Sequence, residues 1–179
     1  MDQQTYRDIM RYHAGAVTII SVGVPGGRTG LTATAFCSLT DDPPTVVACI
    51  NRNASAHDLI AQHQAFCVNV LASLQQDVAM RFAGRVGHEG EQRFDADAWT
   101  TLSTGAPVLQ GALANLDCEV IETLDGKTHT IYLGRVKAGR INGDERPLIY
   151  FKGEFCDVKA KPAKPAKPAR KASAKPAKV

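Results

Sequence analysis

Short apolar runs, separated by polar or turn-forming segments, dominate the first third of the chain. Residues 16–24 are almost entirely apolar and rich in β-branched side chains, which predicts a buried strand. Residues 29–39 alternate between mainly hydroxyl-bearing and mainly small apolar side chains, which predicts a second strand. That strand has to end before Pro43 and Pro44, because proline cannot donate a ladder hydrogen bond. Residues 45–50 predict a third strand.

Three segments show the spacing or the end signals of helices. Residues 2–13 repeat apolar side chains at helical intervals. Residues 55–64 begin with the S-x-x-D pattern of a helix start, with Ser55 as the N-cap. Residues 73–82 predict a third helix, which a glycine closes. Residues 85–106 are polar and contain glycine, so we expect a long excursion with a short helix.

Strands dominate the rest of the chain. They are predicted at residues 66–71, 111–124, 129–141 and 148–151, and Asp125-Gly126 is a strong hairpin signal. Strands follow strands more often than they alternate with helices, so the expected fold class is mainly β with a few helices. The pattern favours an antiparallel barrel with appended helices over a doubly wound parallel sheet.

The charge distribution divides the 179-residue chain near its C-terminus. Residues 1–158 hold 13 Lys and Arg against 18 Asp and Glu, whereas residues 159–179 hold seven Lys, one Arg and no acid. The second segment consists mainly of Lys, Ala and Pro. It has no large apolar side chain whose burial could offset the conformational entropy lost on ordering. We expect one folded domain, residues 1–158, and a disordered basic tail, residues 159–179. The composition of the tail favours a solvated appendage, and weak contact with nucleic acid is the alternative.

The cysteines and the N-terminus bear on the cellular compartment. The five cysteines include no CxxC pair, and four lie inside apolar runs, which favours free thiols in a reducing compartment. No Cys/His cluster has ligand spacing, so no metal site is expected. The N-terminus lacks a signal-peptide core, and no apolar run reaches the roughly 18 residues of a membrane span. These features predict a cytoplasmic protein without membrane contact.

Four elements carry candidate chemistry, and none is decisive alone. Residues 30–40 (GLTATAFCSLT) combine small and hydroxyl side chains, although a half-buried strand is the plainer interpretation. Residues 49–58 (CINRNASAHD) lead from a strand into a helix start, which is either ordinary capping or a phosphate site. Arg81 either complements a helix dipole or reaches a phosphate. His129 begins a strand, where a surface role is more typical than a catalytic one. Motifs of Rossmann, P-loop, serine-hydrolase and zincin sites are absent.

Taken in order, the segments resemble the short-chain flavin reductase family, whose fold is the FMN-binding split barrel. The resemblance spans about residues 5–156 and rests on GRTGLTATAFCSLTDDPPTVVACINRNASAHDLI, FCVNVLASLQQDVAMRFAG, RFDADAW, GAPVLQGALANLDCEV, GKTHTIYLGRV and RPLIYFKGEF. The chain most resembles reductase components of two-component flavin monooxygenases, such as that of 4-hydroxyphenylacetate 3-monooxygenase. It is also similar to the flavin reductase of pyrimidine degradation. The resemblance implies an antiparallel split β-barrel.

The resemblance also implies roles for particular residues. His129 would be catalytic, beside the nicotinamide and the flavin edge. The residues implied to bind flavin or nucleotide are Gly30, Leu31, Thr32, Thr34, Ala35, Cys49, Ile50, Asn51, Ser55, Ala56, His57, Arg81 and Tyr150. In this set, residues 30–35 would line the ring, Ser55 and Arg81 would meet the phosphate, and Tyr150 would meet the nicotinamide nucleotide.

The implied activity is NAD(P)H-dependent reduction of FMN or FAD, with the reduced flavin passed to a separate oxygenase. Hydride passes from nicotinamide C4 to flavin N5, so the protein supplies orientation and electrostatics and needs no catalytic triad. A non-catalytic flavin-binding module on the same fold is the alternative. The resemblance further implies a homodimer with flavin sites near the subunit interface. The sequence does not distinguish FMN from FAD or NADH from NADPH. It also leaves open whether the flavin stays bound or is released in each cycle.

Overall fold

The computed structural model describes residues 1–143 and 145–158, and strands account for most of its regular structure. The strands are β1 (Gly15–Ala16), β2 (Thr18–Val22), β3 (Thr29–Ala33), β4 (Phe36–Asp41), β5 (Pro44–Asn51), β6 (Ala65–Val70), β7 (Trp99–Thr100), β8 (Val108–Leu109), β9 (Ala114–Gly126), β10 (His129–Ile141), β11 (Leu148–Phe151) and β12 (Glu154–Asp157). The helices are α1 (Gln3–Met10), α2 (Ser55–His63), α3 (Gln76–Phe82) and the 3-10 turn η1 (Gly90–Phe94). The predicted class, mainly β with a few helices, is confirmed.

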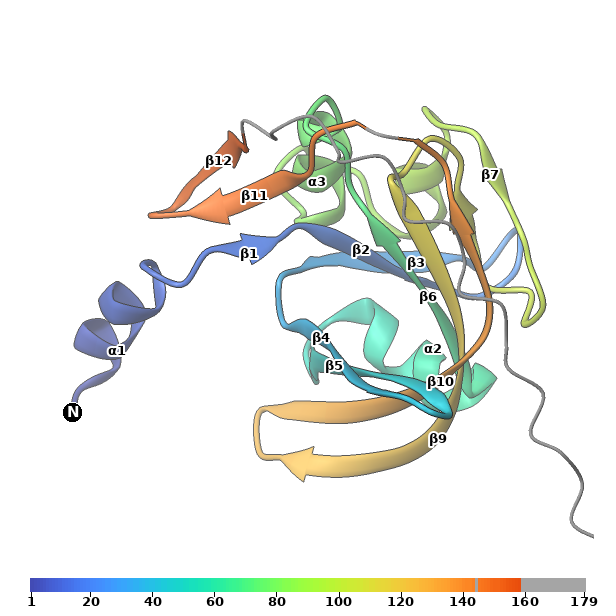
Figure 1. Cartoon of the computed structure of the whole chain (residues 1–179), viewed down its shortest axis with the longest axis horizontal. Coiled ribbons are helices and arrows are strands. Elements are labelled where there is room, and N and C mark those ends of the chain that lie inside the picture. Colours follow the sequence, from blue (N-terminus) through green and yellow to red (C-terminus); the bar gives the residue numbers. More distant parts are fainter. Residues whose placement is uncertain (144, 159–179) are drawn as a thin grey trace, which may run out of the picture.

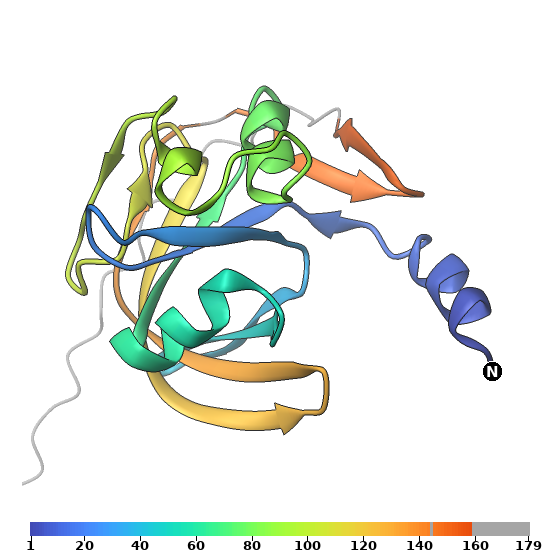
Figure 2. The ribbon, with the colours of Figure 1, turned by 180° about the vertical axis from the view of Figure 1, so that it is seen from behind.

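Seven strands form one antiparallel sheet in the order β3-β2-β6-β9-β10-β5-β4. Its two edge strands, β3 and β4, are consecutive in the chain and are joined only by Thr34 and Ala35. A sheet whose opposite edges are tied by two residues has to roll up. Figures 1 and 2 show it curving from β2 and β3 around α2 to the β9–β10 hairpin. This is the antiparallel split β-barrel that the sequence predicted.

The strand β2 is buried along its whole length because it separates two apolar cores. Ile20 points into the barrel core with Phe66 and Tyr132, whereas Ile19 points into a second core with Phe82. Successive strand residues face opposite sides, so both faces of β2 need apolar residues. The neighbouring strand β3 contacts α2 and α3, which places it between the two helices.

A smaller sheet and a helical arm extend from the barrel. The sheet has the order β1-β11-β12, and α1 precedes it with none of its residues buried. Both ribbon views show α1 projecting clear of the barrel (Figures 1 and 2). The backbone N–H of Lys152, in the β11–β12 turn, donates to the Arg11 carbonyl at 2.7 Å. The Lys152 ammonium also lies 4.9 Å from the Tyr12 ring centroid, so the arm and the hairpin are tied together.

The single strand predicted at residues 29–39 is wrong, because β3 and β4 are separate strands. The chain turns at Thr34 and Ala35, where the alternation of faces is lost. Phe36 therefore packs on the barrel core, while the Thr32 hydroxyl donates to the Ala79 carbonyl of α3 at 2.6 Å. This corner carries the chain from one edge of the sheet to the other.

Two helix starts also differ from the prediction. Ala54 is the N-cap of α2 and makes no side-chain cap bond, whereas the Ser55 hydroxyl lies 2.9 Å from that of Thr29. The third helix begins at Gln76 and not at residue 73. The predicted short helix in residues 85–106 is confirmed as η1. The sequence analysis does not predict the short strands β7, β8 and β12.

The two described ranges contain no helix that is long and apolar enough to cross a membrane. The predicted basic tail, residues 159–179, lies outside the described residues. Its disorder and the domain boundary before it therefore stay predictions.

Candidate functional site

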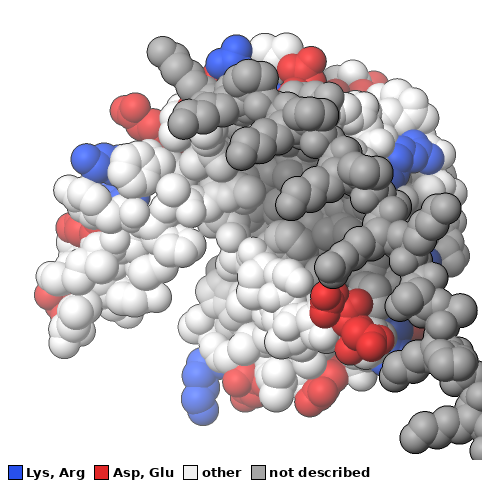
Figure 3. Space-filling model, viewed as in Figure 1, with Lys and Arg blue, Asp and Glu red and all other residues white. Residues whose placement is uncertain are grey.

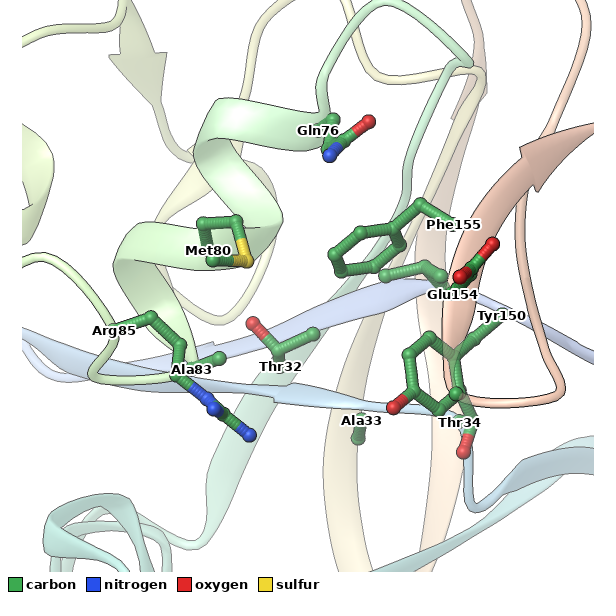
Figure 4. Close-up of a pocket in the computed structure, with 12 residues that line it drawn as sticks. Thr32, Ala33, Thr34, Gln76, Met80, Ala83, Arg85, Tyr150, Glu154 and Phe155 are labelled. Atoms are coloured by element: carbon green, nitrogen blue, oxygen red, sulfur yellow. The ribbon is translucent and has the colours of Figure 1, made fainter. Parts of the chain in front are cut away.

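Two adjoining cavities open beside β3. Their volumes are about 600 and about 510 Å³, within the range of small-molecule sites. Thr32 and Ala83 line both of them, so the cavities meet at this pair of residues. Figure 4 shows Thr32 of β3 lying next to Met80 and Ala83 of the α3 region. Together the cavities form one elongated candidate site.

Three elements wall the first cavity. They are β3 with its corner, the α3 region and the β11–β12 hairpin. The lining residues are Val17, which lies between β1 and β2, and Thr32, Ala33, Thr34, Gln76, Met80, Ala83, Arg85, Tyr150, Gly153, Glu154 and Phe155. Tyr150 and Phe155 converge on this space from β11 and β12 (Figure 4), with ring centroids 5.4 Å apart. This lining combines aromatic and thioether surface with hydroxyl and amide groups and with the charged side chains of Arg85 and Glu154, which suits a flat ligand that also carries polar groups.

The second cavity lies between β3, the start of α2 and the segment around η1. Its lining residues are Gly30, Leu31, Thr32, Asn53, Ala54, Ser55, Phe82, Ala83, Gly84, Glu89, Gly90 and Arg93. Arg93 donates through Nη1 to the Gly30 carbonyl at 2.9 Å and through Nε to the His88 carbonyl at 3.0 Å. Within the described ranges Arg93 has no carboxylate partner, so its charge is available to an anionic group.

Six of the predicted binding residues line these cavities. They are Gly30, Leu31, Thr32, Thr34, Ser55 and Tyr150. They come from three segments that are distant in sequence, and the fold brings them to one elongated site.

Arg81, predicted to reach a phosphate, lines neither cavity. Its side chain is 6% exposed and pairs with Asp97 at 2.7 Å and with Asp77 at 3.5 Å. It also donates to the Arg93 carbonyl at 3.2 Å. Two carboxylates already balance its charge, and its contact with Arg93 supports the wall of the second cavity. A direct phosphate role for Arg81 stays a prediction.

A second group of predicted residues lies on the paired strands β5 and β10. His129 is opposite Asn51, Thr130 is opposite Ile50, and the next pair contains Cys49. Ile50 is 1% exposed and belongs to the barrel core, so its side chain faces away from solvent. His129, Asn51 and Cys49 occupy the opposite face of the sheet. None of the four lines either cavity, and the His129 imidazole lies 2.9 Å from the Thr128 hydroxyl.

The last three predicted residues also lie outside the cavity walls. Ala35 is exposed at the β3–β4 corner, where its carbonyl accepts from the Cys49 N–H at 3.0 Å. Ala56 is fully buried in the barrel core. The imidazole of His57 bonds to Thr130 Oγ1 and to Asp58 Oδ1, each at 2.9 Å, so its ring faces β10. The ligand contacts of these residues stay predictions.

Two thiols of the barrel sheet are not prepared as nucleophiles. Burial raises the pKa of Cys118 to about 12 and, together with Cys37, raises the pKa of Cys49. Both therefore stay protonated near neutral pH. Among the described residues, no three His, Cys, Asp or Glu side chains gather as a metal site. The chemistry of the site accordingly depends on what it binds.

Sequence reasoning missed several lining residues. Gln76 and Met80 lie within the predicted helix and Ala83 directly follows it at helical spacing, so the face that they form could have been found. Phe155 belongs to the unpredicted strand β12. Arg93 lies in the aperiodic excursion and begins the resembling block RFDADAW, to which the sequence assigns no site role.

Fold and cavities together define a split-barrel protein with two adjoining cavities beside β3. A scan against protein families matches residues 10–159 to the family described as "Flavin reductase like domain". The chain belongs to this family, which confirms the predicted resemblance.

Similarity to known proteins extends over most of the chain. FMN reductase (NADH) RutF of Pantoea ananatis (strain LMG 20103) is 44% identical over 151 residues, covering 84% of this chain and 78% of the relative. BorF, the flavin reductase component of a bacterial two-component tryptophan halogenase, has a TM-score of 0.82 and 31% identity, covering 89% of this chain and 100% of that one. NADH:FAD oxidoreductase SgcE6 of Streptomyces globisporus C-1027, solved with NAD and FAD fragments, has a TM-score of 0.79 and 28% identity, covering 90% and 94%.

Proposed function

We propose that this protein is an NADH-dependent flavin reductase that supplies reduced FMN or FAD to a separate flavin-dependent oxygenase. The observation that carries the proposal is the pair of adjoining cavities on β3, one aromatic and one with an available guanidinium, in a member of the flavin reductase-like family. A flavin nucleotide has a flat apolar ring at one end and a phosphate at the other, and the residues present fit that shape.

In this proposal the flavin ring lies along β3, beside the small residues Gly30 and Ala33. The phosphate lies in the second cavity near Ser55 and Arg93, and the nicotinamide enters the first cavity against Tyr150. Because β3 is an edge strand, one side of its backbone has no partner strand and can bond to a ligand. The Gly30 carbonyl already accepts from Arg93, which supports an open edge toward the second cavity.

The cofactors supply the redox chemistry, since the bound flavin accepts the hydride that the nicotinamide donates. The chain's own residues bind and orient the two ligands, and holding them in contact supplies the proximity effect. The Thr32 hydroxyl is committed to the Ala79 carbonyl, which fixes α3 and Met80 against β3. The apolar walls exclude water from the contact between the ligands.

The direct test uses purified protein, NADH and added flavin, followed at the nicotinamide absorbance band. We expect NADH oxidation that requires FMN or FAD. No oxidation with FMN, FAD or riboflavin, using either NADH or NADPH, would rule out the reductase. A protein that binds flavin but leaves NADH unoxidised would favour the alternative, a non-catalytic flavin-binding module.

We further propose that the protein is a homodimer. The barrel sheet has apolar residues on its outside as well as its inside, and we call this outer set the outer face: Val47, Cys49, Leu124, Ile131 and Leu133. A solvated sheet face normally alternates to polar residues, so this one requires a cover. Figure 3 shows few charged side chains over the middle of the lower lobe, where β4, β5 and the β9–β10 hairpin lie. By strand alternation His129 and Asn51 share this face.

The arm α1 favours a second copy as that cover. Tyr6, Ile9 and Met10 are exposed on a helix of eight residues, which is too short to be stable alone in water. One chain thus has two uncovered apolar surfaces, and a two-fold pair can cover both. In such a pair the partner would also cover His129, which lines no cavity within one copy.

The location and the tail stay predictions. The five free cysteines support a reducing, cytoplasmic location. Weak nucleic-acid contact by residues 159–179 rests on charge alone, and binding through it would weaken steeply with salt.

A further inference from the structure

The wall of the second cavity around η1 begins with glycines, which contribute no side-chain packing, and ends at a packed aromatic ring. Gly84, Gly87 and Gly90 have φ values of 70°, 73° and 47°, a backbone region that side chains rarely adopt. At the other end, the Phe94 ring packs edge-on against Phe82 with centroids 5.1 Å apart. The lining residues between these ends therefore depend on polar contacts for their position.

An ion pair between Glu91 and Arg28 supplies the strongest of those contacts. The Glu91 carboxylate accepts from the Arg28 backbone N–H at 2.8 Å, from Nε at 2.7 Å and from Nη2. The Arg28 guanidinium also lies 4.5 Å from the Phe94 ring centroid. The hydrogen bonds from Arg28 hold the pKa of Glu91 below its usual value. Charge-assisted bonds of this kind are the stronger ones in proteins.

We propose that Arg28 and Glu91 are a positioning pair for the anionic end of the flavin. Arg28 directly precedes β3, and Glu91 lies two residues before Arg93, so the pair joins the strand under the ring to the wall that carries the guanidinium. Neither residue lines the second cavity, so the pair acts through Arg93 and Gly90. This inference rests on the proposed function, because it concerns affinity for the phosphate in that same site.

The test compares FMN with riboflavin, which has the same ring and no phosphate, by fluorescence titration. Glu91→Gln and Arg28→Gln should each raise the Kd for FMN about tenfold, the effect of losing one charge-assisted bond, and change that for riboflavin less than about twofold. The double variant should lose no more FMN affinity than either single variant, because each single substitution already breaks the same ion pair. The control is Glu119→Gln, which breaks the exposed pair with Lys137 at 3.2 Å and should bind both ligands like the wild type.

Each alternative outcome has a distinct meaning. Unchanged FMN binding, equal losses for FMN and riboflavin, or additive losses in the double variant would overturn the positioning role. Near-UV circular dichroism reports whether each variant is folded. If Glu91→Gln unfolds, Arg28→Lys keeps the charge without the planar fork, and wild-type FMN affinity in that variant would overturn the inference. A wild-type protein that binds no flavin would instead overturn the proposed function.

Discussion

Gly30 is a residue of the candidate site at which packing limits substitution sharply. A Cβ there would lie 2.7 Å from the Ile20 carbonyl oxygen and 2.9 Å from Phe82 Cε1. Neither the strand backbone nor the buried ring can move away cheaply, so Gly30→Ala should lower the free energy of unfolding by about 1–3 kcal/mol in urea titrations. The matched control is Gly27→Ala, whose nearest neighbour is the Val24 carbonyl at 3.9 Å, and it should change stability by less than about 0.5 kcal/mol. Equal stability of the two variants would contradict this packing role.

The two arginines near the site show what residue types can and cannot predict. Arg81 lies at a helix end in a resembling block, and the resemblance implies that it is a phosphate residue. In the structure Asp97, sixteen residues further on, pairs with it at 2.7 Å. Arg93 lines the second cavity from a segment without periodicity. Which of the two arginines lines the cavity depends on tertiary contacts between a helix and a loop, and residue spacing does not encode these contacts.

At the scale of elements, the β11–β12 hairpin should determine nucleotide affinity. Tyr150 lines the first cavity and packs against Phe155, so Tyr150→Ala should remove the aromatic wall. We expect about a tenfold rise in the KM for NADH, equivalent to one aromatic contact, with little change in the Kd for FMN. Steady-state kinetics measure the first and fluorescence titration the second. Tyr150→Phe is the matched control and should retain most of the NADH affinity, whereas an equal loss in both variants would assign the effect to the hydroxyl.

The elements themselves were predictable where local signals agree. The apolar run at residues 16–24 and the Asp125-Gly126 hairpin signal correspond to β2 and to the β9–β10 hairpin. The β3–β4 corner was missed, because Thr34 and Ala35 carry no turn signal. The strand β12 was missed although Lys152-Gly153 has φ values of 54° and 88°, the geometry of a tight hairpin turn. Lysine before glycine marks such a turn far less clearly than asparagine or aspartate does.

At the scale of the molecule, local pattern indicates a barrel but not its strand order. Pairing β2 with β6, β6 with β9 and β10 with β5 joins segments that are distant in sequence, and only closure of the whole sheet selects them. The split-barrel form came from the family resemblance. The same long-range pairing puts His129 on the outer face of the sheet, outside both cavities, a separation that the order of motifs does not reveal.

The outer face gives the prediction that belongs to the whole molecule. Leu133 is paired with Val47 of β5 and with Glu122 of β9, and a second carboxylate beside Glu122 would have to be buried in the proposed dimer without a cationic partner. Leu133→Glu should therefore convert a dimer of 19.2 kDa chains into monomers in sedimentation experiments. The control is Ile141→Glu, because Ile141 is 86% exposed at the far end of β10, and it should leave the dimer intact. A wild-type protein that sediments as a monomer would refute the dimer. Since His129 shares the outer face, the Leu133→Glu monomer should also oxidise NADH more slowly, and full activity in that monomer would show that one copy contains the whole site.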